Sequence, residues 1–465
     1  MTVKTENNSV IKTSRHLPQF PPAIQLALTL HFLRHVINQR KAPSSTLAWL
    51  FIVVLQPYVG LPLYLLLGSR KIHLTKRKLS LPHVVIPSDN HDPMQVVARA
   101  SGATAACENA SLKFLTDGKI AFIELLSLIN QATKTIFLEI YIFSDDEVGN
   151  EILDALTVKA KAGLDVRILL DSFGALLSGN PKFKKFMEAG GKFVKFMPLL
   201  KNPLRGSANL RNHRKLLVID NHKAMTGGMN IASEYMGPVY DSERWLDQAM
   251  IIEGPLVNDI SKLFLQDWAF ATDREEEELP QPFEGAVQGH VTQLIASGPD
   301  LDADPIYEWL LTAIYTAKKS IWITTPYFIP DESLGKALEL AAKRGLDVRL
   351  VIPKKSNHLV ADLARTTYLE QLEDAGGKIM HHQQMIHAKV TLIDEKYGFA
   401  GSANMDARSL LLNYELGIAI YSEEDIAQLK QWFEKLFPRC LQGTVRKSAV
   451  HAWVGSIARL ISPLL

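Results

Sequence analysis

Residues 213–230 read HRKLLVIDNHKAMTGGMN, and this stretch decides the fold. The apolar run Leu-Leu-Val-Ile within it predicts a short buried strand. His213 and Lys215 are two residues apart, so on an extended backbone their side chains point to the same face. A Gly-Gly pair then allows a tight turn, which returns the amide of Asn230 toward that face. The stretch therefore predicts a strand flanked by an imidazole, an amine and an amide.

The same pattern recurs at residues 387–404, which read HAKVTLIDEKYGFAGSAN. Each distinctive position recurs 174 residues later, measured from His213 to His387. The matched pairs are His213 and His387, Lys215 and Lys389, Asp220 and Asp394, Gly227 and Gly401, Gly228 and Ser402, and Asn230 and Asn404. Such an array at one constant offset predicts a duplicated structural unit.

Strand and helix patterns alternate in the same order before each copy of this stretch. Before the first copy, the predicted strands are 135–143, 164–171 and 192–196, and the predicted helices are 151–162 and 183–190. Before the second copy, the predicted strands are 320–325, 346–352 and 378–381, and the predicted helices are 334–344 and 368–375. Strand–helix–strand order predicts parallel βαβ units, so the expected fold class is α/β.

The composition is that of a globular protein. The chain has 465 residues, of which 47% are hydrophobic and 22% are charged, and this length allows two or three domains. The net charge of +2 lacks the basic excess of many nucleic-acid binders, so no nucleic-acid partner is expected. Cys107 and Cys440 are far apart in the sequence and favour free thiols. The group of His381, His382 and His387 has no nearby fourth ligand, so no metal is expected.

Residues 46–67 contain no charged side chain, and the segment is long enough for a helix that crosses a bilayer. Pro57, Gly60 and Pro62 interrupt its middle, which leaves a kinked or re-entrant helix pair open. A buried core helix is the other alternative. The segment is followed by basic residues, namely Arg70, Lys71, Lys76, Arg77 and Lys78. By the positive-inside rule, these residues place the rest of the chain on the cytoplasmic side.

The pattern H-x-K-x4-D-x6-G-[SG]-x-N, present twice, resembles the motif of the phospholipase D superfamily. The block Ala48-Trp49, Pro57, Gly60, Tyr64 and Gly68 and the terminal Ser-Pro-Leu-Leu narrow the resemblance to bacterial cardiolipin synthases. The resemblance implies two phospholipase D-like α/β/α repeats, packed pseudo-symmetrically, with an N-terminal transmembrane anchor. The expected divisions are 1–79 for the tail and anchor, 80–282 for the first half and 283–465 for the second half, with the boundary in the charged linker 274–282.

Two such faces, brought together between the halves, would surround a phosphodiester. Lysine and amide groups bind its non-bridging oxygens and offset their charge. One imidazole attacks phosphorus, and the other transfers protons to and from the alcohols. The expected catalytic residues are His213, Lys215, Asp220, His387, Lys389 and Asp394, and the expected phosphate-binding residues are Asn230, Asn404 and Ser402. Asp220 and Asp394 are expected to join the two halves structurally, and Ser402 is equally compatible with a turn.

The resemblance implies separate roles for the two histidines. His213 is the expected nucleophile and His387 the expected acid and base, while the reverse assignment stays open because the two motifs are alike. A carboxylate behind an imidazole sets its tautomer and raises its basicity. By the resemblance, Asp247 supports His213 and Glu415 supports His387.

The resemblance also implies the reaction. The phosphatidyl group of one phosphatidylglycerol passes to a second one, giving cardiolipin and glycerol, with no cofactor. The expected location is the bacterial inner membrane. Hydrolysis of phospholipid, or less plausibly of nucleic acid, is the alternative, because the motif does not separate transfer from hydrolysis. A non-catalytic membrane scaffold is a third reading, disfavoured because both motifs are complete. The oligomeric state stays open.

Overall fold

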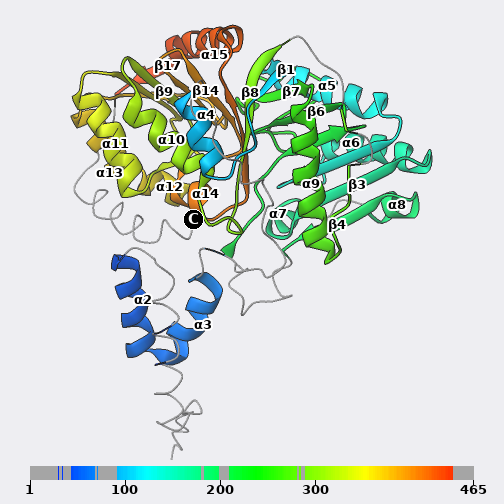
Figure 1. Cartoon of the computed structure of the whole chain (residues 1–465), viewed down its shortest axis with the longest axis horizontal. Helices are drawn as coiled ribbons and strands as arrows, with labels where there is room; N and C mark the ends of the chain where they lie inside the picture. The colour runs from blue at the N-terminus through cyan, green and yellow to red at the C-terminus, as the bar shows by residue number, and fades with distance from the viewer. Residues whose placement is uncertain are drawn as a thin grey trace, which may run out of the picture. The chain divides into compact units, whose positions relative to one another are not determined.

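The computed structural model of the chain describes residues 30, 34, 43–68, 71, 92–179, 183–197, 209–279, 282–283 and 289–443. The chain divides into two compact units, Met1–Gly68 and Ser69–Leu465. The larger unit contains both copies of the repeated motif (Figure 1).

The smaller unit is a pair of short helices, α2 (Pro43–Leu55) and α3 (Pro57–Leu67). Pro57 occupies the first turn of α3, where a missing N–H costs nothing. Trp49 packs edge-on against Tyr64 with ring centroids 5.1 Å apart. The helices approach closely at Gly60, where a Cβ atom would lie 2.6 Å from the carbonyl oxygen of Ile52. The predicted segment 46–67 is therefore an interrupted helix pair.

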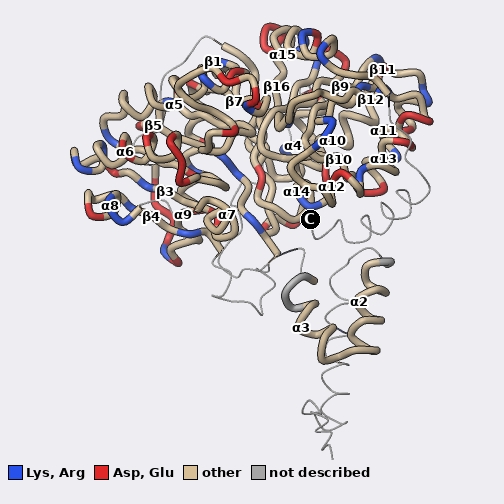
Figure 2. The backbone as a smooth tube through the Cα atoms, turned by 180° about the vertical axis from the view of Figure 1, so that it is seen from behind, with Lys and Arg blue, Asp and Glu red and all other residues tan. Residues whose placement is uncertain are grey.

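Figure 2 shows that α2 and α3 carry no charged residue. Their outward side chains are large and apolar, as at Phe51 and Leu55, which are 63% and 70% exposed. Among the helices that the structure describes, none is both long and apolar enough to cross a membrane. Of the basic residues predicted to follow the pair, Lys71 lies in the described part, where it forms an ion pair of 2.9 Å with Asp304.

The larger unit is built on one 15-stranded sheet, whose strands fall into two sets. The elements of the first half are β1 (Cys107–Leu115), α5 (Gly118–Gln131), β2 (Thr135–Ile140), α6 (Glu147–Lys161), β3 (Asp165–Asp171), α7 (Ser172–Leu177), α8 (Phe183–Glu188), β4 (Lys192–Phe196), β5 (Leu216–Ile219), β6 (Lys223–Gly227), β7 (Ala249–Glu253) and α9 (Leu256–Thr272).

The second half contains the corresponding elements and a few additions. They are β8 (His290–Ser297), α10 (Pro305–Thr316), β9 (Ser320–Thr324), β10 (Phe328–Ile329), α11 (Glu332–Lys343), β11 (Asp347–Pro353), α12 (Leu359–Ala364), α13 (Thr366–Asp374), β12 (Lys378–His382), β13 (Val390–Ile393), β14 (Tyr397–Gly401), β15 (Met405–Asp406), α14 (Ala407–Leu411), β16 (Glu415–Ile420), α15 (Glu423–Leu436), a 3-10 turn at Phe437–Arg439 and β17 (Cys440–Gln442). The strands and helices predicted around the two motifs are all present, with ends shifted by a few residues.

The order of strands confirms the duplication. From β1 outward the order is β7, β6, β5, β2, β3 and β4, and from β8 outward it is β16, β14, β13, β9, β11 and β12. The outer strands β2, β3 and β4 run parallel, as do β9, β11 and β12. The antiparallel pair β1–β8 joins the two sets, with Cys107 opposite Thr292. The fold is therefore a mixed α/β repeat with one continuous sheet.

Helices cover both faces of the sheet in each half (Figure 1). In the first half, α5, α6 and α8 pack on one face and α9 on the other. In the second half, α10, α11 and α13 occupy the position of the first group, and α15 that of α9. The core beneath α9 and α15 is continuous across the halves. Figure 2 shows acidic and basic residues interspersed along both halves.

Two segments cross the predicted domain divisions. Helix α4 (Pro93–Ala100), assigned by sequence to the first half, buries Met94 and Ala98 in the core of the second half. The predicted linker 274–282 contacts the first half, because Glu277 forms a 2.8 Å ion pair with Arg167. Cys107 and Cys440 are free thiols, as predicted.

Asp220 and Asp394 each close a turn within their own half, so the prediction that they join the halves is wrong. Asp220 accepts hydrogen bonds of 2.7–2.8 Å from the backbone N–H groups of Thr133, Lys134 and Thr135. Asp394 accepts the equivalent bonds from residues 318–320. Both aspartates follow the motif strand, whereas the histidines precede it, so the strand length separates the two groups.

We predict that Asp220→Ala lowers the free energy of unfolding by about 1–2 kcal/mol, because three donors lose an ionised acceptor at a partly exposed site. Burial raises the pKa of Asp220, but the hydrogen bonds from 133–135 outweigh this and lower the pKa below its usual value. The ionised carboxylate is therefore stabilising above the usual aspartate pKa, and the effect disappears as pH falls through the lowered pKa.

Chemical denaturation of the wild type and the variant should thus differ at neutral pH and converge in acid. Asp394→Ala should lose a similar amount. The folded fraction of either variant should keep its specific activity, and a loss of turnover without a loss of stability would place these aspartates in catalysis after all.

Candidate active site

The two motif histidines meet where the halves pair through their backbones. The N–H of His213 donates to the carbonyl of Tyr414 at 2.9 Å, and the N–H of His387 donates to the carbonyl of Leu246 at 2.7 Å. Parallel bridges at Asn212–Tyr414 and Leu246–Ile386 belong to the same two crossings. Each histidine therefore lies beside a segment of the other half.

These crossings give each histidine a carboxylate from the opposite half. The Nδ1 atom of His213 lies 3.1 Å from both carboxylate oxygens of Glu415. The Nδ1 atom of His387 lies 2.7 Å from Oδ2 of Asp247. The predicted pairing of Asp247 with His213 and of Glu415 with His387 is therefore reversed. The reason is that Glu415 directly follows Tyr414 and Asp247 directly follows Leu246, the residues bonded to the histidine backbones.

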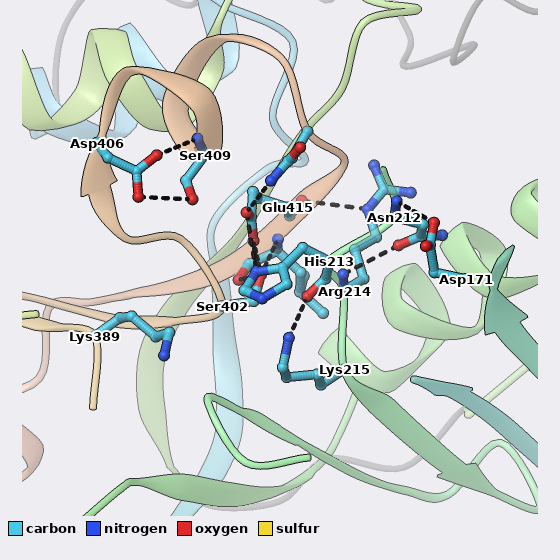
Figure 3. A network of polar contacts seen from close by, with 12 residues as sticks. Asp171, Asn212, His213, Arg214, Lys215, Lys389, Ser402, Asp406, Ser409 and Glu415 are labelled. Atoms are coloured by element: carbon cyan, nitrogen blue, oxygen red, sulfur yellow. Dashed lines mark hydrogen bonds and ion pairs between the residues drawn. The ribbon is translucent and has the colours of Figure 1, made fainter. Parts of the chain in front are cut away.

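Both carboxylate side chains are fully buried, and each binds Nδ1 rather than Nε2. An Nδ1–H donated to a carboxylate leaves Nε2 as the nitrogen with an available lone pair. The arrangement therefore orients both rings. Figure 3 shows Glu415 and the ring of His213 in this contact. At His387 the amine of Lys389 also contacts the ring, 2.6 Å from Nδ1 and 3.0 Å from Nε2.

The two carboxylates are themselves held differently. Ser402 donates to Oε2 of Glu415 at 2.5 Å and accepts from the N–H of Leu416 at 3.0 Å. The hydroxyl expected at the phosphate is therefore bonded to the supporting carboxylate. At the equivalent position, a Cβ on Gly228 would lie 2.2 Å from Oδ1 of Asp247, so glycine leaves the room that this carboxylate needs.

Burial makes both histidines neutral at pH 7. Burial and the nearby Lys215 lower the pKa of His213, against the opposing effect of Glu415. Burial and Lys389 lower the pKa of His387 to about 3, against the opposing effect of Asp247. The 2.7 Å contact of His387 is thus a hydrogen bond from a neutral imidazole to an ionised carboxylate, not a permanent ion pair.

Glu415 and Asp247 stay ionised because neighbouring imidazole and amine groups outweigh the effect of burial on their pKa values. Burial raises the pKa of Glu415, but His213 and Lys215 outweigh it and lower the pKa below its usual value. Lys389 and His387 have the same net effect on Asp247, again against burial.

The motif lysines enter the site from the two halves. Lys215 donates to the carbonyl of His213 at 2.8 Å, and Lys389 donates to the carbonyl of His387. Both lysines also lower the pKa of His213, which places their charges near its ring. Burial lowers the pKa of Lys215 to about 7 and that of Lys389 to about 8. Figure 3 shows both amines near His213.

A cavity of about 680 Å³ opens in front of the two imidazoles. Its lining includes both motif histidines and both motif amides: His213, His387, Asn230 and Asn404. Helices α7 and α12 add an apolar part that includes Phe173, Leu177 and Leu359. Within the described ranges, no three His, Cys, Asp or Glu side chains converge as metal ligands would.

Several cavity residues were not predicted as part of the site. Tyr235 packs edge-on against His387, with ring centroids 5.0 Å apart. Arg211 and Arg408 lie on the wall beside His213. The position of Arg211 two residues before His213 was a usable signal, since both side chains share a face. Tyr141, directly after β2, packs edge-on against His213 with ring centroids 4.9 Å apart.

Behind the motif, a buried polar network holds the strand in place. Arg214 pairs with Asp267 and donates to the carbonyl of Ser297 at 3.0 Å. Asn212 donates to Glu139. Burial, followed by the charge of Asp267, raises the pKa of Glu139 well above its usual value. The side chains of Asn212 and Arg214, which alternate along the chain with those of His213 and Lys215, are therefore held by buried polar partners.

The fold and the paired sites define a two-motif phospholipase D-like protein. The family model described as "Cardiolipin synthase, PLD-like domain" matches residues 125–268 and 310–437, and "Phospholipase_D-nuclease N-terminal" matches residues 27–69. The chain belongs to the cardiolipin synthase family with phospholipase D-like domains.

Named relatives match along nearly the whole chain. Cardiolipin synthase 1 of Bacillus anthracis is 35% identical over 92% of this chain and 91% of its own length. Cardiolipin synthase of Clostridium perfringens strain 13 is 33% identical over 92% of this chain and 95% of its own. The crystal structure of a phosphatidylserine synthase from Haemophilus influenzae Rd KW20 has a TM-score of 0.61 at 15% identity, covering 80% of this chain and 100% of that chain, so it shares the fold.

We predict that an anion in the cavity draws protons into the site. The pKa is about 7 for Lys215 and about 8 for Lys389, against the ordinary lysine value of 10.5. Above pH 8 and below 10.5, the free protein therefore holds both amines mostly neutral. A bound phosphodiester favours the charged amines and raises both pKa values, so binding takes up as many as two protons.

Calorimetric titration with a water-soluble dialkyl phosphate, repeated in buffers of different ionisation enthalpy, measures this uptake. Lys215→Met should remove about one proton from it. Lys184→Met, at a side chain that is 87% exposed, is the matched control and should change nothing. Binding without proton uptake in this pH range would mean that the amines are already charged in the free protein.

Proposed function

We propose that the chain is a phosphatidyltransferase that joins two phosphatidylglycerol molecules into cardiolipin and releases glycerol. The observation that carries this proposal is the pair of imidazoles, each oriented by a carboxylate of the other half, facing one cavity. The family relationship supplies the substrate class, because the named relatives are cardiolipin synthases over nearly their whole length.

In the first step, Nε2 of His213 attacks the phosphorus of the donor lipid. A nitrogen–phosphorus bond forms, and the bond from phosphorus to the glycerol headgroup breaks. His387 gives a proton to the departing glycerol oxygen. Lys215, Lys389 and the two motif amides offset the charge on the non-bridging oxygens as the transition state forms.

In the second step, His387 takes the proton from a hydroxyl of a second phosphatidylglycerol. That oxygen attacks phosphorus, and the bond to His213 breaks. The cycle therefore needs no net proton and no external energy source, since one phosphodiester replaces another. The low pKa of His387 in the free protein fits this role only with a phosphodiester present, because the added negative charge raises the pKa of the imidazole.

His213 is the better candidate for the nucleophile. Its side chain is 12% exposed, against 5% for that of His387, so it is the more accessible of the two from the cavity. Both oxygens of Glu415 hold its Nδ1 atom, which stabilises the positive charge that develops on a phosphorylated imidazole.

The test of this function is the fate of phosphatidylglycerol labelled in its headgroup glycerol. Vesicles with the full chain should yield cardiolipin and labelled free glycerol in equal amounts. His213→Ala should reduce both by roughly 10⁴-fold or more, because the residues of such a site act as a unit. Mass spectrometry of the wild type quenched during turnover should find a phosphatidyl adduct on the peptide that contains His213.

The outcomes separate the alternatives. Phosphatidic acid without cardiolipin would make the chain a hydrolase. An adduct on His387 instead of His213 would reverse the two roles, and normal turnover in His213→Ala would remove the covalent mechanism.

We also propose that the chain works at the cytoplasmic face of a bacterial membrane. Two features support contact with a membrane. Helices α2 and α3 are uncharged and expose apolar side chains. The cavity rim carries exposed apolar residues on α7 and α12, namely Phe173, Leu177 and Leu359, with 42%, 56% and 70% exposure. Such a rim suits the entry of lipid headgroups whose acyl chains stay in the bilayer.

We predict that L177D combined with L359D lowers turnover of phosphatidylglycerol in vesicles about tenfold or more. Each apolar side chain contributes roughly 1.5–3 kcal/mol on transfer from water, and 1.4 kcal/mol corresponds to a tenfold change. Turnover of a dispersed short-chain phosphatidylglycerol should change little.

Val158→Asp is the control, since Val158 is 65% exposed on α6 and does not line the cavity. Equal losses on vesicles and on dispersed lipid would show that the rim supports catalysis rather than contact with the bilayer.

A further inference from the structure

The catalytic centre is nearly symmetric, but its surroundings are not. The segment before β5 is extended, so Arg211, His213 and Lys215 share one face while Asn212 and Arg214 occupy the other. Asn212 and Arg214 bond into the buried network behind the motif. Arg211 instead lines the cavity beside His213 and is 4% exposed.

A second guanidinium reaches the same wall from the other half. Arg408, in α14, donates to Oδ1 of Asn209 at 2.8 Å and to its carbonyl oxygen at 2.7 Å. Asn209 and Arg408 both line the cavity. Tyr141 lies between this wall and the catalytic centre. Its ring is 4.9 Å from that of His213. Burial raises the pKa of its phenol, and the charges of both arginines oppose this rise.

The repeat offers an internal comparison for this arginine pair. Arg211 lies two residues before His213, and the equivalent residue before His387 is Met385. Arg408 lies four residues after Asn404, and the equivalent residue after Asn230 is Glu234. Neither Met385 nor Glu234 lines the cavity. On that side, His387 is flanked by the rings of Tyr235 and Trp245, at centroid distances of 5.0 and 5.7 Å. Among the cavity-lining residues that the structure describes, the cationic side chains are therefore Arg211 and Arg408, on the side of His213.

The carboxylates near this wall have other partners. Asp171 lies 4.0 Å from Arg211 and accepts backbone N–H bonds from Phe173, Gly174 and Asn212 at 2.8–3.0 Å. Asp406 caps α14 by accepting from the N–H of Ser409 at 2.7 Å. Burial raises the pKa of both carboxyls.

We propose that Arg211 and Arg408 bind the phosphodiester of the acceptor lipid, while the reacting phosphate lies between His213 and His387. This inference rests on the proposed function, in which the acceptor is a second phosphatidylglycerol. Its phosphate stays intact and must be held somewhere in the cavity.

The spacing fits the product. Neighbouring side chains on one face of an extended segment are about 7 Å apart, which is the step from His213 to Arg211. In cardiolipin the two phosphorus atoms are separated by two ester oxygens and three carbons, a bridge of similar reach. Guanidinium groups suit this task because they bind phosphate oxygens through paired N–H donors and stay charged.

The test compares two reactions of the same phosphatidyl-enzyme. One is cardiolipin formation from phosphatidylglycerol. The other is headgroup exchange, in which labelled free glycerol replaces the headgroup of phosphatidylglycerol. Both need the donor lipid and both histidines, but only the first has an acceptor that carries a phosphate.

Arg211→Gln and Arg408→Gln should each reduce cardiolipin formation about tenfold to a hundredfold at limiting phosphatidylglycerol, through the loss of a charge-assisted contact. Glycerol exchange should stay within about twofold of the wild type. Arg408→Lys should fall between, because it keeps the charge and loses the paired donors. Glu234→Gln, at the position equivalent to Arg408, is the control and should leave both rates unchanged.

The outcomes separate this inference from the function beneath it. Equal losses in both reactions, with unchanged thermal unfolding, would overturn the inference, since the arginines would then act on the donor or on the catalytic step. Cardiolipin formation that is insensitive to both substitutions would overturn it as well. A wild-type chain that makes no cardiolipin while it exchanges or hydrolyses headgroups would overturn the proposed function itself, and this inference with it.

Discussion

The structure depends on two backbone crossings between the halves. Hydrogen bonds from His213 to Tyr414 and from His387 to Leu246 place each motif histidine beside a strand segment of the opposite repeat. Because the next residues along those segments are Glu415 and Asp247, each imidazole receives its carboxylate from the other half. Neither half therefore contains a complete histidine–carboxylate pair by itself, and the continuous sheet through β1 and β8 keeps the two in register.

Burial at these crossings determines the electrostatics of the site. The carboxylates lie away from water yet stay ionised, because cationic or polar partners surround them. Burial lowers the pKa values of Lys215 and Lys389 to about 7 and 8. An anion that enters the site favours the charged amines and raises the pKa of both lysines. The cavity is thereby matched to a phosphodiester rather than to water or to a neutral ligand.

Because the two halves are repeats, differences between equivalent positions can be identified directly. Ser402 bonds to Glu415, whereas Gly228 in the other half only leaves room for Asp247. Two arginines line the cavity on the side of His213, whereas the rings of Tyr235 and Trp245 flank His387. A transfer between two similar lipids needs two different positions for them, and residues outside the motif supply that difference.

The sequence by itself determined the duplication, the α/β class and the identity of the motif residues. Those features depend on local spacing: apolar runs set the strands, and the two-residue step from His213 to Lys215 puts both side chains on one face. The tertiary structure decided which carboxylate serves which histidine, because that pairing depends on contacts between residues 202 and 140 positions apart. It also placed Asp220 and Asp394 at turns away from the imidazoles, and brought Arg408 from the second half to the wall beside Arg211. No local pattern encodes those encounters, since they arise only when the two halves pack.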